Sequence, residues 1–252
     1  MTAATATADA GQTLYDAAIR LTEDFAALEA LLRDTAAGPS GLIHVAVAPV
    51  FGRLYVVPRL PEFFESYPGI RIEMLASDRV VNLIEDGIDL AIRHGDLVDS
   101  SLTARRLATN SFVTVATPCY LERHGTPAEP SHLTKHSCIA FSSRREVRPW
   151  LFVMHDGAKV QHQPEGRFRT GDGEQLRAAV LEHLGIAHVP AWLVTPELAS
   201  GALRAILHNH ETETLAISAV FPGRHRLAAK VRVLVDFLAR TLPHDLSLTA
   251  LL

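Results

Sequence analysis

Residues 41–96 constrain the fold most, because strand-like and helix-like patterns alternate through them without a break. The run 42–47 is apolar apart from His44, which is typical of a strand buried on both faces of a parallel sheet. Pro49 ends this strand, because proline has no N–H to donate and restricts the residue before it. The turn at 48–52 then opens directly into a helical pattern.

The same alternation continues to the end of the stretch. Apolar residues recur at helical spacing over 54–67, and residues 70–74 alternate as a strand. Residues 80–84 predict a second short helix, closed by Gly87, and 88–92 predict a third strand. Helical crossovers require parallel strands, so the pattern indicates an α/β fold.

The strand ends in this stretch form the candidate ligand site. In open parallel sheets, ligands bind at the carboxyl ends of strands, where helix amino termini present free N–H groups and a positive dipole end. The turn at 50–53 and the tripeptide Arg93-His94-Gly95 both fall at such ends. A small anion suits these groups, and they recognise it without transforming it, so the pattern indicates sensing.

Composition sets the class of protein. With 252 residues, 48% hydrophobic and 21% charged, the chain is long enough for two compact α/β lobes. Cys119 and Cys138 are too few for a disulfide framework, which indicates a reducing, cytoplasmic setting; a redox switch between them is the alternative. No signal peptide or transmembrane stretch is recognisable, so no membrane partner is expected. The formal charge of −4 gives no electrostatic footprint for nucleic acid.

The amino-terminal region carries a second pattern, which predicts a linker helix over residues 10–36. Its apolar residues alternate at spacings of four and three with charged residues between them, as in a coiled-coil seam. We expect this helix to pair with a second copy in a homodimer or homotetramer; the alternative is an amphipathic helix lying on its own domain. Residues 1–9 are expected to be disordered. The seam residues are Leu14, Ala18, Leu21, Phe25, Leu28 and Leu32.

The remaining residues predict a second lobe. Its strand patterns lie at 112–116, 137–141, 150–154, 166–170 and 186–189. Asp156-Gly157 between two of these is a hairpin signal, and residues 119–124 predict a short helix. Asp172 followed by Gln175 resembles an N-capping arrangement for a helix that Gly185 ends.

The last strand and helix, at 215–221 and 231–238, are expected to return to the first lobe. Ala116-Thr117-Pro118 and the region around Ile217 would then cross between the lobes. The expected division is 41–115 plus 216–252 for the first lobe and 116–215 for the second.

Five stretches resemble one known family, and the similarity runs from residue 10 to residue 241. They look like the effector-binding domain of LysR-type transcriptional regulators. The resemblance implies a two-lobed, periplasmic-binding-protein-like (type 2) fold with two crossing segments, preceded by a long linker helix. The stretches are APVFGRLY at 48–55, SDRVVNLIEDGIDLAIR at 77–93, CYLERHGTP at 119–127, GIAHVP at 185–190 and KVRVLVDFL at 230–238.

Two departures from the family stand out. The winged helix-turn-helix that precedes this region in relatives is absent from the sequence given, so DNA contact is expected only through a domain missing here. Either the chain is truncated or it acts without reading DNA itself. The second departure is Gly171, where relatives often carry a polar residue.

The resemblance implies that a small-molecule effector binds between the lobes. We expect the N–H groups of 50–53 and the hydroxyls of Thr117 and Ser142 to hold a carboxylate, Arg93 to supply charge, and aromatic residues to stack on the effector. The alternatives are a surface salt bridge for Arg93, a structural role for His94, and plain loop chemistry for the serines. The implied lining is Pro49, Val50, Phe51, Arg93, His94, Thr117, Phe141, Ser142, Ser143, Asp172 and Val189.

No catalytic motif competes with this interpretation, so neither an enzyme nor a cofactor or metal is expected. A metal at His208-Asn209-His210 is a weaker alternative, and Arg144-Arg145 with Arg148 is read as solvated loop charge. Two other functions stay open. One is a free-standing solute-binding protein, disfavoured because no export signal is present, and the other is a cytoplasmic enzyme on the same scaffold.

Overall fold

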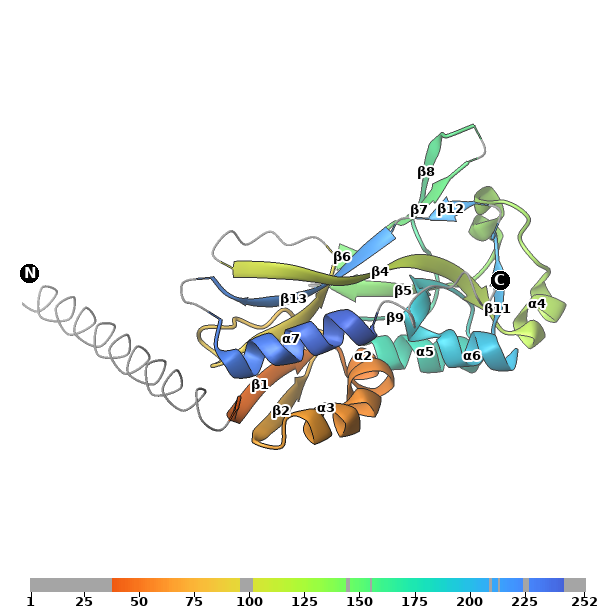
Figure 1. Ribbon diagram of the computed structural model, residues 1–252. Coiled ribbons are helices and arrows are strands. Elements are labelled where there is room, and N and C mark those ends of the chain that lie inside the picture. Colours follow the sequence, from red (N-terminus) through yellow and green to blue (C-terminus); the bar gives the residue numbers. More distant parts are fainter. Residues whose placement is uncertain are drawn as a thin grey trace, which may run out of the picture.

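The computed structural model describes residues 38–95, 102–143, 146–154, 156–208, 210–212, 214–223 and 227–242 (Figure 1). The predicted linker helix over 10–36, with its six seam residues, lies outside these residues, as do residues 1–9. Most of the strands belong to one ten-stranded sheet, whose main order is β2-β1-β3-β13-β4-β10-β5-β6.

The first lobe is built around β1 (Gly41–Val47), as its apolar sequence predicts. This strand pairs in parallel with β2 (Ile70–Ala76) on one side and with β3 (Leu90–His94) on the other. The side chains of Ile43, Val45 and Val47 are buried. The predicted parallel α/β arrangement is therefore confirmed for the first three strands.

The chain between β1 and β2 is helical but irregular. Pro58 and Pro61 lack N–H donors, and each proline ring crowds the preceding turn, so one regular α-helix cannot run through the segment. The buried Phe63 nevertheless anchors it, with its ring centroid 5.3 Å from that of Phe237. The successive pieces are α2 (Pro49–Phe51), a π-helical turn (Gly52–Val56), a 3-10 turn (Val57–Arg59) and α3 (Leu60–Ser66).

The helix predicted over 80–84 does not form. Residues 77–89 make a loop with turns, and β3 starts two residues later than predicted. Val80 and Ile84 are 73% and 62% exposed, so the apolar spacing there meets no surface to pack on. Side chains also take over backbone hydrogen bonds, because Asp86 accepts from the Asn82 N–H at 3.0 Å.

The two lobes are joined by β4 (Leu102–Ala116) and β13 (Thr214–Pro222). β4 pairs antiparallel with β13 from Leu102 to Ser111 and with β10 (Ile186–Pro190) from Phe112 onwards. The chain therefore crosses between the lobes within β4, where its partner changes after Ser111. We had expected the crossing a few residues later, at Ala116-Thr117-Pro118. Ile217 lies in the first-lobe sheet, opposite residues of both β3 and β4.

The second lobe continues the sheet from β10 and adds a small sheet of its own. The predicted hairpin at Asp156-Gly157 is present, but its second strand is β8 rather than the stretch 166–170. β7 and β8 project at the top right of Figure 1, with β12 beside β7. The strands are β5 (Cys138–Ser143), β6 (Glu146–Val147), β7 (Trp150–Val153), β8 (Lys159–His162), β9 (Arg169–Thr170), β11 (Arg204–Ile206) and β12 (Glu211–Thr212).

Helices cover the sheet, and α7, α5 and α6 follow one another along the side that faces the viewer in Figure 1. Asp172 caps α5 as predicted, since its carboxylate accepts the N–H of Gln175 at 2.8 Å. In the part of the chain that the structure describes, no helix has the length and apolar character needed to cross a membrane. The helices are α4 (Pro118–His124), α5 (Gly173–Leu181), α6 (Thr195–Ser200) and α7 (Ala229–Thr241), with 3-10 turns at Pro130–Lys135 and Ala191–Leu193.

We expect Ile217→Ala to lower the free energy of unfolding by about 2–5 kcal/mol, because Ile217 is fully buried between β3 and β4. Urea denaturation followed by circular dichroism measures the loss. Val80→Ala, on the exposed loop, is the control and should change stability by no more than about 0.5 kcal/mol. An equal loss in both variants would contradict this account of the core.

Candidate functional site

A cavity of about 940 Å³ lies between the lobes, near the upper end of the range for small-molecule sites. The first lobe contributes the end of β1, the loop at 77–84 and the end of β3. The second lobe contributes the start of α5, residues 148–150 and the end of β10 with the turn after it. The cavity thus lies where strand ends from both lobes meet, as the strand-end rule predicts.

Four of the eleven predicted effector residues line this cavity: Arg93, His94, Phe141 and Val189. Pro49, Val50, Ser142, Ser143 and Asp172 are not among the lining residues. Contact between any of the eleven and an effector remains a prediction.

Phe51 and Thr117 serve the protein's own packing. Phe51 is fully buried, with its ring centroid 4.8 Å from His94 and 5.3 Å from Trp192, so it supports the cavity wall from behind. Thr117 is buried at the start of α4, where its hydroxyl accepts the Tyr120 N–H and lies 2.7 Å from His183 Nδ1. Its hydroxyl is therefore already engaged inside the second lobe.

Several lining residues were not predicted from the sequence. His188 belongs to β10, and Trp192 lies in the turn after it. Asp78 and Arg79 follow the end of β2. The strand-end rule applied to every strand would have pointed to both places. Phe112, Arg148 and Trp150 also line the cavity, and no sequence signal indicated that they would come together there.

Charge around the cavity is predominantly positive, since Arg79, Arg93 and Arg148 line it together with one acid, Asp78. Arg93 donates from Nη2 to the Val81 carbonyl at 2.7 Å. Among the described residues no carboxylate forms an ion pair with Arg93, so the structure gives no support to the surface-salt-bridge alternative. A guanidinium held in this way can still donate to an anion in the cavity.

Two histidines in the wall have lowered pKa values, so both are neutral at pH 7. His94 stacks on Trp192 with ring centroids 4.8 Å apart, and burial lowers its pKa to about 4. His188 stacks on Phe112 at 5.1 Å, and burial, assisted by the charge of Arg148, lowers its pKa to about 3. Both rings therefore offer aromatic surface rather than positive charge.

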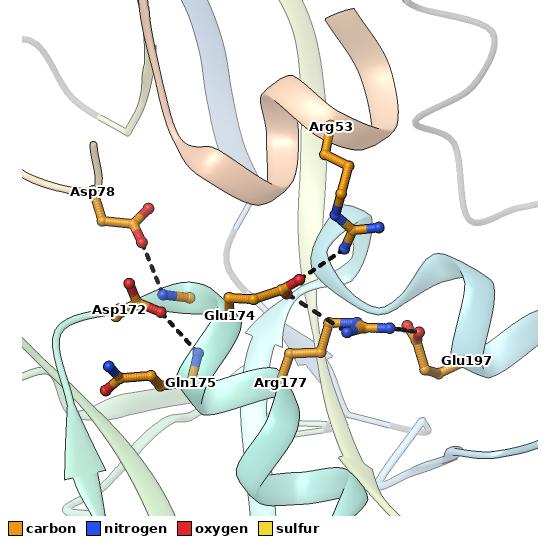
Figure 2. Close-up of polar contacts among 8 residues, drawn as sticks. Arg53, Asp78, Asp172, Glu174, Gln175, Arg177 and Glu197 are labelled. Carbon is orange, nitrogen blue, oxygen red and sulfur yellow. Dashed lines mark hydrogen bonds and ion pairs between the residues drawn. The ribbon is translucent and has the colours of Figure 1, made fainter. Parts of the chain in front are cut away.

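A pair of polar bridges joins the lobes at the start of α5 (Figure 2). Asp78, from the first lobe, accepts the Gly173 N–H at 2.8 Å. Arg53 donates to Glu174 at 3.0 Å, and Glu174 also lies 3.6 Å from Arg177. The side chains of Arg53 and Glu174 are about half exposed, so this ion pair contributes about 0–1 kcal/mol.

The Asp78 carboxylate is held by one hydrogen bond, but its surroundings make its ionised form less stable. Burial raises its pKa, and the nearby Asp172 and Glu174 carboxylates raise it further, while the hydrogen bond from Gly173 acts in the other direction. The net shift is upward, which means that the ionised carboxylate is less favourable in this bridge than in water.

Neither alternative metal or redox chemistry finds support in the described residues. No group of three or more histidine, cysteine or acidic residues there is arranged to hold a metal ion. Cys138 and Cys119 are both free thiols. Burial raises the pKa of Cys138 to about 12, so this thiol stays protonated and lacks the thiolate that a redox switch requires.

Comparisons with known proteins agree with this architecture. The family described as "LysR substrate binding domain" matches residues 36–243. An HTH-type transcriptional regulator from Escherichia coli, YhjC, is 32% identical over 91% of this chain and 77% of its own length. The regulator CrgA of Neisseria meningitidis is 31% identical over 94% of this chain and 79% of its own length.

Solved structures of LysR-type transcriptional regulators also resemble this chain. The structure of CrgA, described as a LysR-type transcriptional regulator from Neisseria meningitidis, superposes with a TM-score of 0.75 at 30% identity, covering 92% of this chain and 79% of that one. The CrgA regulatory domain alone gives a TM-score of 0.73 at 31% identity, covering 83% of this chain and all of that one (100%).

We expect stability to fall as the pH drops from about 6.5 towards 4, because the unfolded state takes up a proton on His94 that the folded state refuses. His94→Phe keeps a ring but removes this proton uptake, which corresponds to on the order of 3 kcal/mol. Urea denaturation at pH 7 and pH 4.5 should therefore show a smaller loss for the variant. The exposed His208→Phe is the control, and equal losses in all three proteins would contradict the assignment.

Proposed function

The chain belongs to the LysR substrate-binding-domain family, and from that premise we propose that it senses a small anionic metabolite bound between its two lobes. It would do so as the effector-binding part of a LysR-type transcriptional regulator. The observation that carries the proposal is the interlobe cavity of about 940 Å³, lined by three arginines and one aspartate. A cavity of that size and balance of charge favours an anion of small-molecule size.

The proposed binding mode follows from the lining. Arg93 lies at the end of β3 and contributes a guanidinium that no described carboxylate neutralises, so it is the candidate partner for a carboxylate. Phe141 and the stacked pair of His94 and Trp192 give the apolar body of the effector a flat surface to pack on. Arg79 adds positive charge from the loop.

Regulation would act through the lobes and the subunits. We propose that effector binding shifts the population of lobe arrangements, and that this changes the spacing of subunits paired through the helix predicted over 10–36. In this proposal DNA is contacted by a helix-turn-helix domain that the sequence given does not include, and the protein works in the cytoplasm. The relatives named above carry the label HTH-type transcriptional regulator, which supports this direction.

Fluorescence offers a direct test of effector binding, because both tryptophans of the chain, Trp150 and Trp192, line the cavity. In a panel of aliphatic and aromatic carboxylic acids, we expect at least one to change the emission saturably and to raise the melting temperature. Arg93→Gln should weaken that acid about 10-fold to 150-fold, the equivalent of one charge-assisted hydrogen bond. Arg71→Gln, an exposed arginine on β2, is the control. An acid that binds both variants equally well would exclude Arg93 as its partner, and a panel without any binder would contradict anion sensing.

Subunit pairing is tested separately. We expect the chain to be a dimer or larger in light scattering, and Leu21→Glu combined with Leu28→Glu to shift it to a monomer, because each places a charge in the predicted seam. Ala26→Glu adds a charge off the seam and should leave the mass unchanged. A monomeric parent protein would contradict the proposed pairing.

A further inference from the structure

Asp78 occupies a position that joins three features of the molecule. It follows the end of β2 in the first lobe, it lines the interlobe cavity, and its carboxylate accepts the N–H of Gly173 in the second lobe. Figure 2 shows it reaching across to the first turn of α5. Gly173 also lines the cavity, so this hydrogen bond forms part of the wall.

The attraction in this bridge comes from the end of the helix. Gly173 is the first residue of α5, where the N–H groups have no partner within the helix and the dipole is positive. A carboxylate acceptor suits that position.

The opposition comes from charge already present at the same helix end. Asp172 uses its carboxylate to cap the Gln175 N–H, and Glu174 stands in the first turn with Arg53 and Arg177 around it. When the lobes come together, Asp78 brings a further negative charge to this place and loses water. This loss of water and the repulsion from Asp172 and Glu174 act against the hydrogen bond from Gly173, and they raise the pKa of Asp78 in the bridge.

The loop that carries Asp78 is lightly packed. Val80 and Ile84 line the cavity and are nevertheless largely exposed, while Leu83 between them is buried. The hydrogen bond from Arg93 to Val81 ties the loop only to its own lobe. Within the described part of this loop, it is Asp78 that forms a hydrogen bond to the other lobe.

We propose that Asp78 sets how readily the cavity opens. Its hydrogen-bonding oxygen holds the loop to α5, and its negative charge, placed beside Asp172 and Glu174, keeps that closed arrangement from becoming too stable for ligand exchange. This inference deepens the proposed function, since it concerns access to the same cavity. In this proposal the acceptor oxygen of Asp78 favours the closed cavity, and the negative charge of the same side chain favours the open one.

Two substitutions at Asp78 distinguish these effects. Asp78→Ala removes the charge and the acceptor together and leaves the Gly173 N–H without its partner, so it should leave the cavity more open than Asp78→Asn does. Asp78→Asn keeps an acceptor oxygen and removes the charge, so it should close the cavity further.

Quenching of tryptophan fluorescence by acrylamide reads the opening without any ligand. Trp150 and Trp192 are the two tryptophans of the chain, both are buried, and both line the cavity. Acrylamide is neutral, so changes of charge do not alter its approach. We expect the Stern–Volmer constant of Asp78→Asn to fall below that of the parent protein, and that of Asp78→Ala to be roughly twofold or more above that of Asp78→Asn.

Glu85→Ala and Glu85→Gln are the matched controls, because Glu85 is an exposed acid on the same loop and the substitutions change net charge and size in the same way. Both should quench like the parent protein. Urea denaturation of each variant shows whether greater quenching reflects unfolding, and the decrease expected for Asp78→Asn cannot arise from loss of structure.

The outcomes are decisive in both directions. Quenching in Asp78→Asn at or above the parent level would overturn the role of charge, and equal quenching in Asp78→Ala and Asp78→Asn would overturn the role of the hydrogen bond. Because no effector is added, failure of this inference is distinct from failure of the proposed function, which the carboxylic acid panel decides.

Discussion

The antiparallel pairing of β4 with β13 is the constraint on which the rest of the structure depends. It runs from the pair Leu102 and Pro222 to the pair Ser111 and Thr214, and it carries the sheet of the first lobe into the second. Since the lobes are connected through these two adjacent strands, strand ends from both sides face one space beside the crossing. The position of the cavity is therefore a consequence of the sheet topology.

Sequence patterns predicted the elements whose boundaries are set by local chemistry. β1 ends at the proline turn as expected, and Asp172 caps α5 as expected, because proline and N-cap residues act within a few positions. The helix over 80–84 failed, because apolar spacing does not reveal whether a packing surface is present. The first half of β4 was missed for the opposite reason: its exposed residues look unlike a strand, and β13 supplies the partner that makes them one.

The location of the candidate site was predictable from the sequence, but the orientation of its side chains was not. The rule that ligands bind at strand ends located Arg93 and His94, because it depends on topology that the sequence reveals. It does not determine which side chains of a turn face the cavity and which enter the core. Phe51 was expected to stack on the effector, yet it is fully buried behind His94 and Trp192. That choice depends on packing between segments far apart in the sequence.

Burial shifts the pKa values of the histidines and of the acid in the cavity wall in opposite directions. Burial holds His94 and His188 neutral down to a pH of about 4 and about 3, so neither ring adds positive charge to the wall at neutral pH. Asp78 differs, because its pKa is raised and it belongs to the bridge between the lobes. The guanidinium groups that would attract an anion and the acid that we propose to oppose lobe closure are therefore different residues. Under this proposal, affinity for the ligand and access to the cavity are set by different residues.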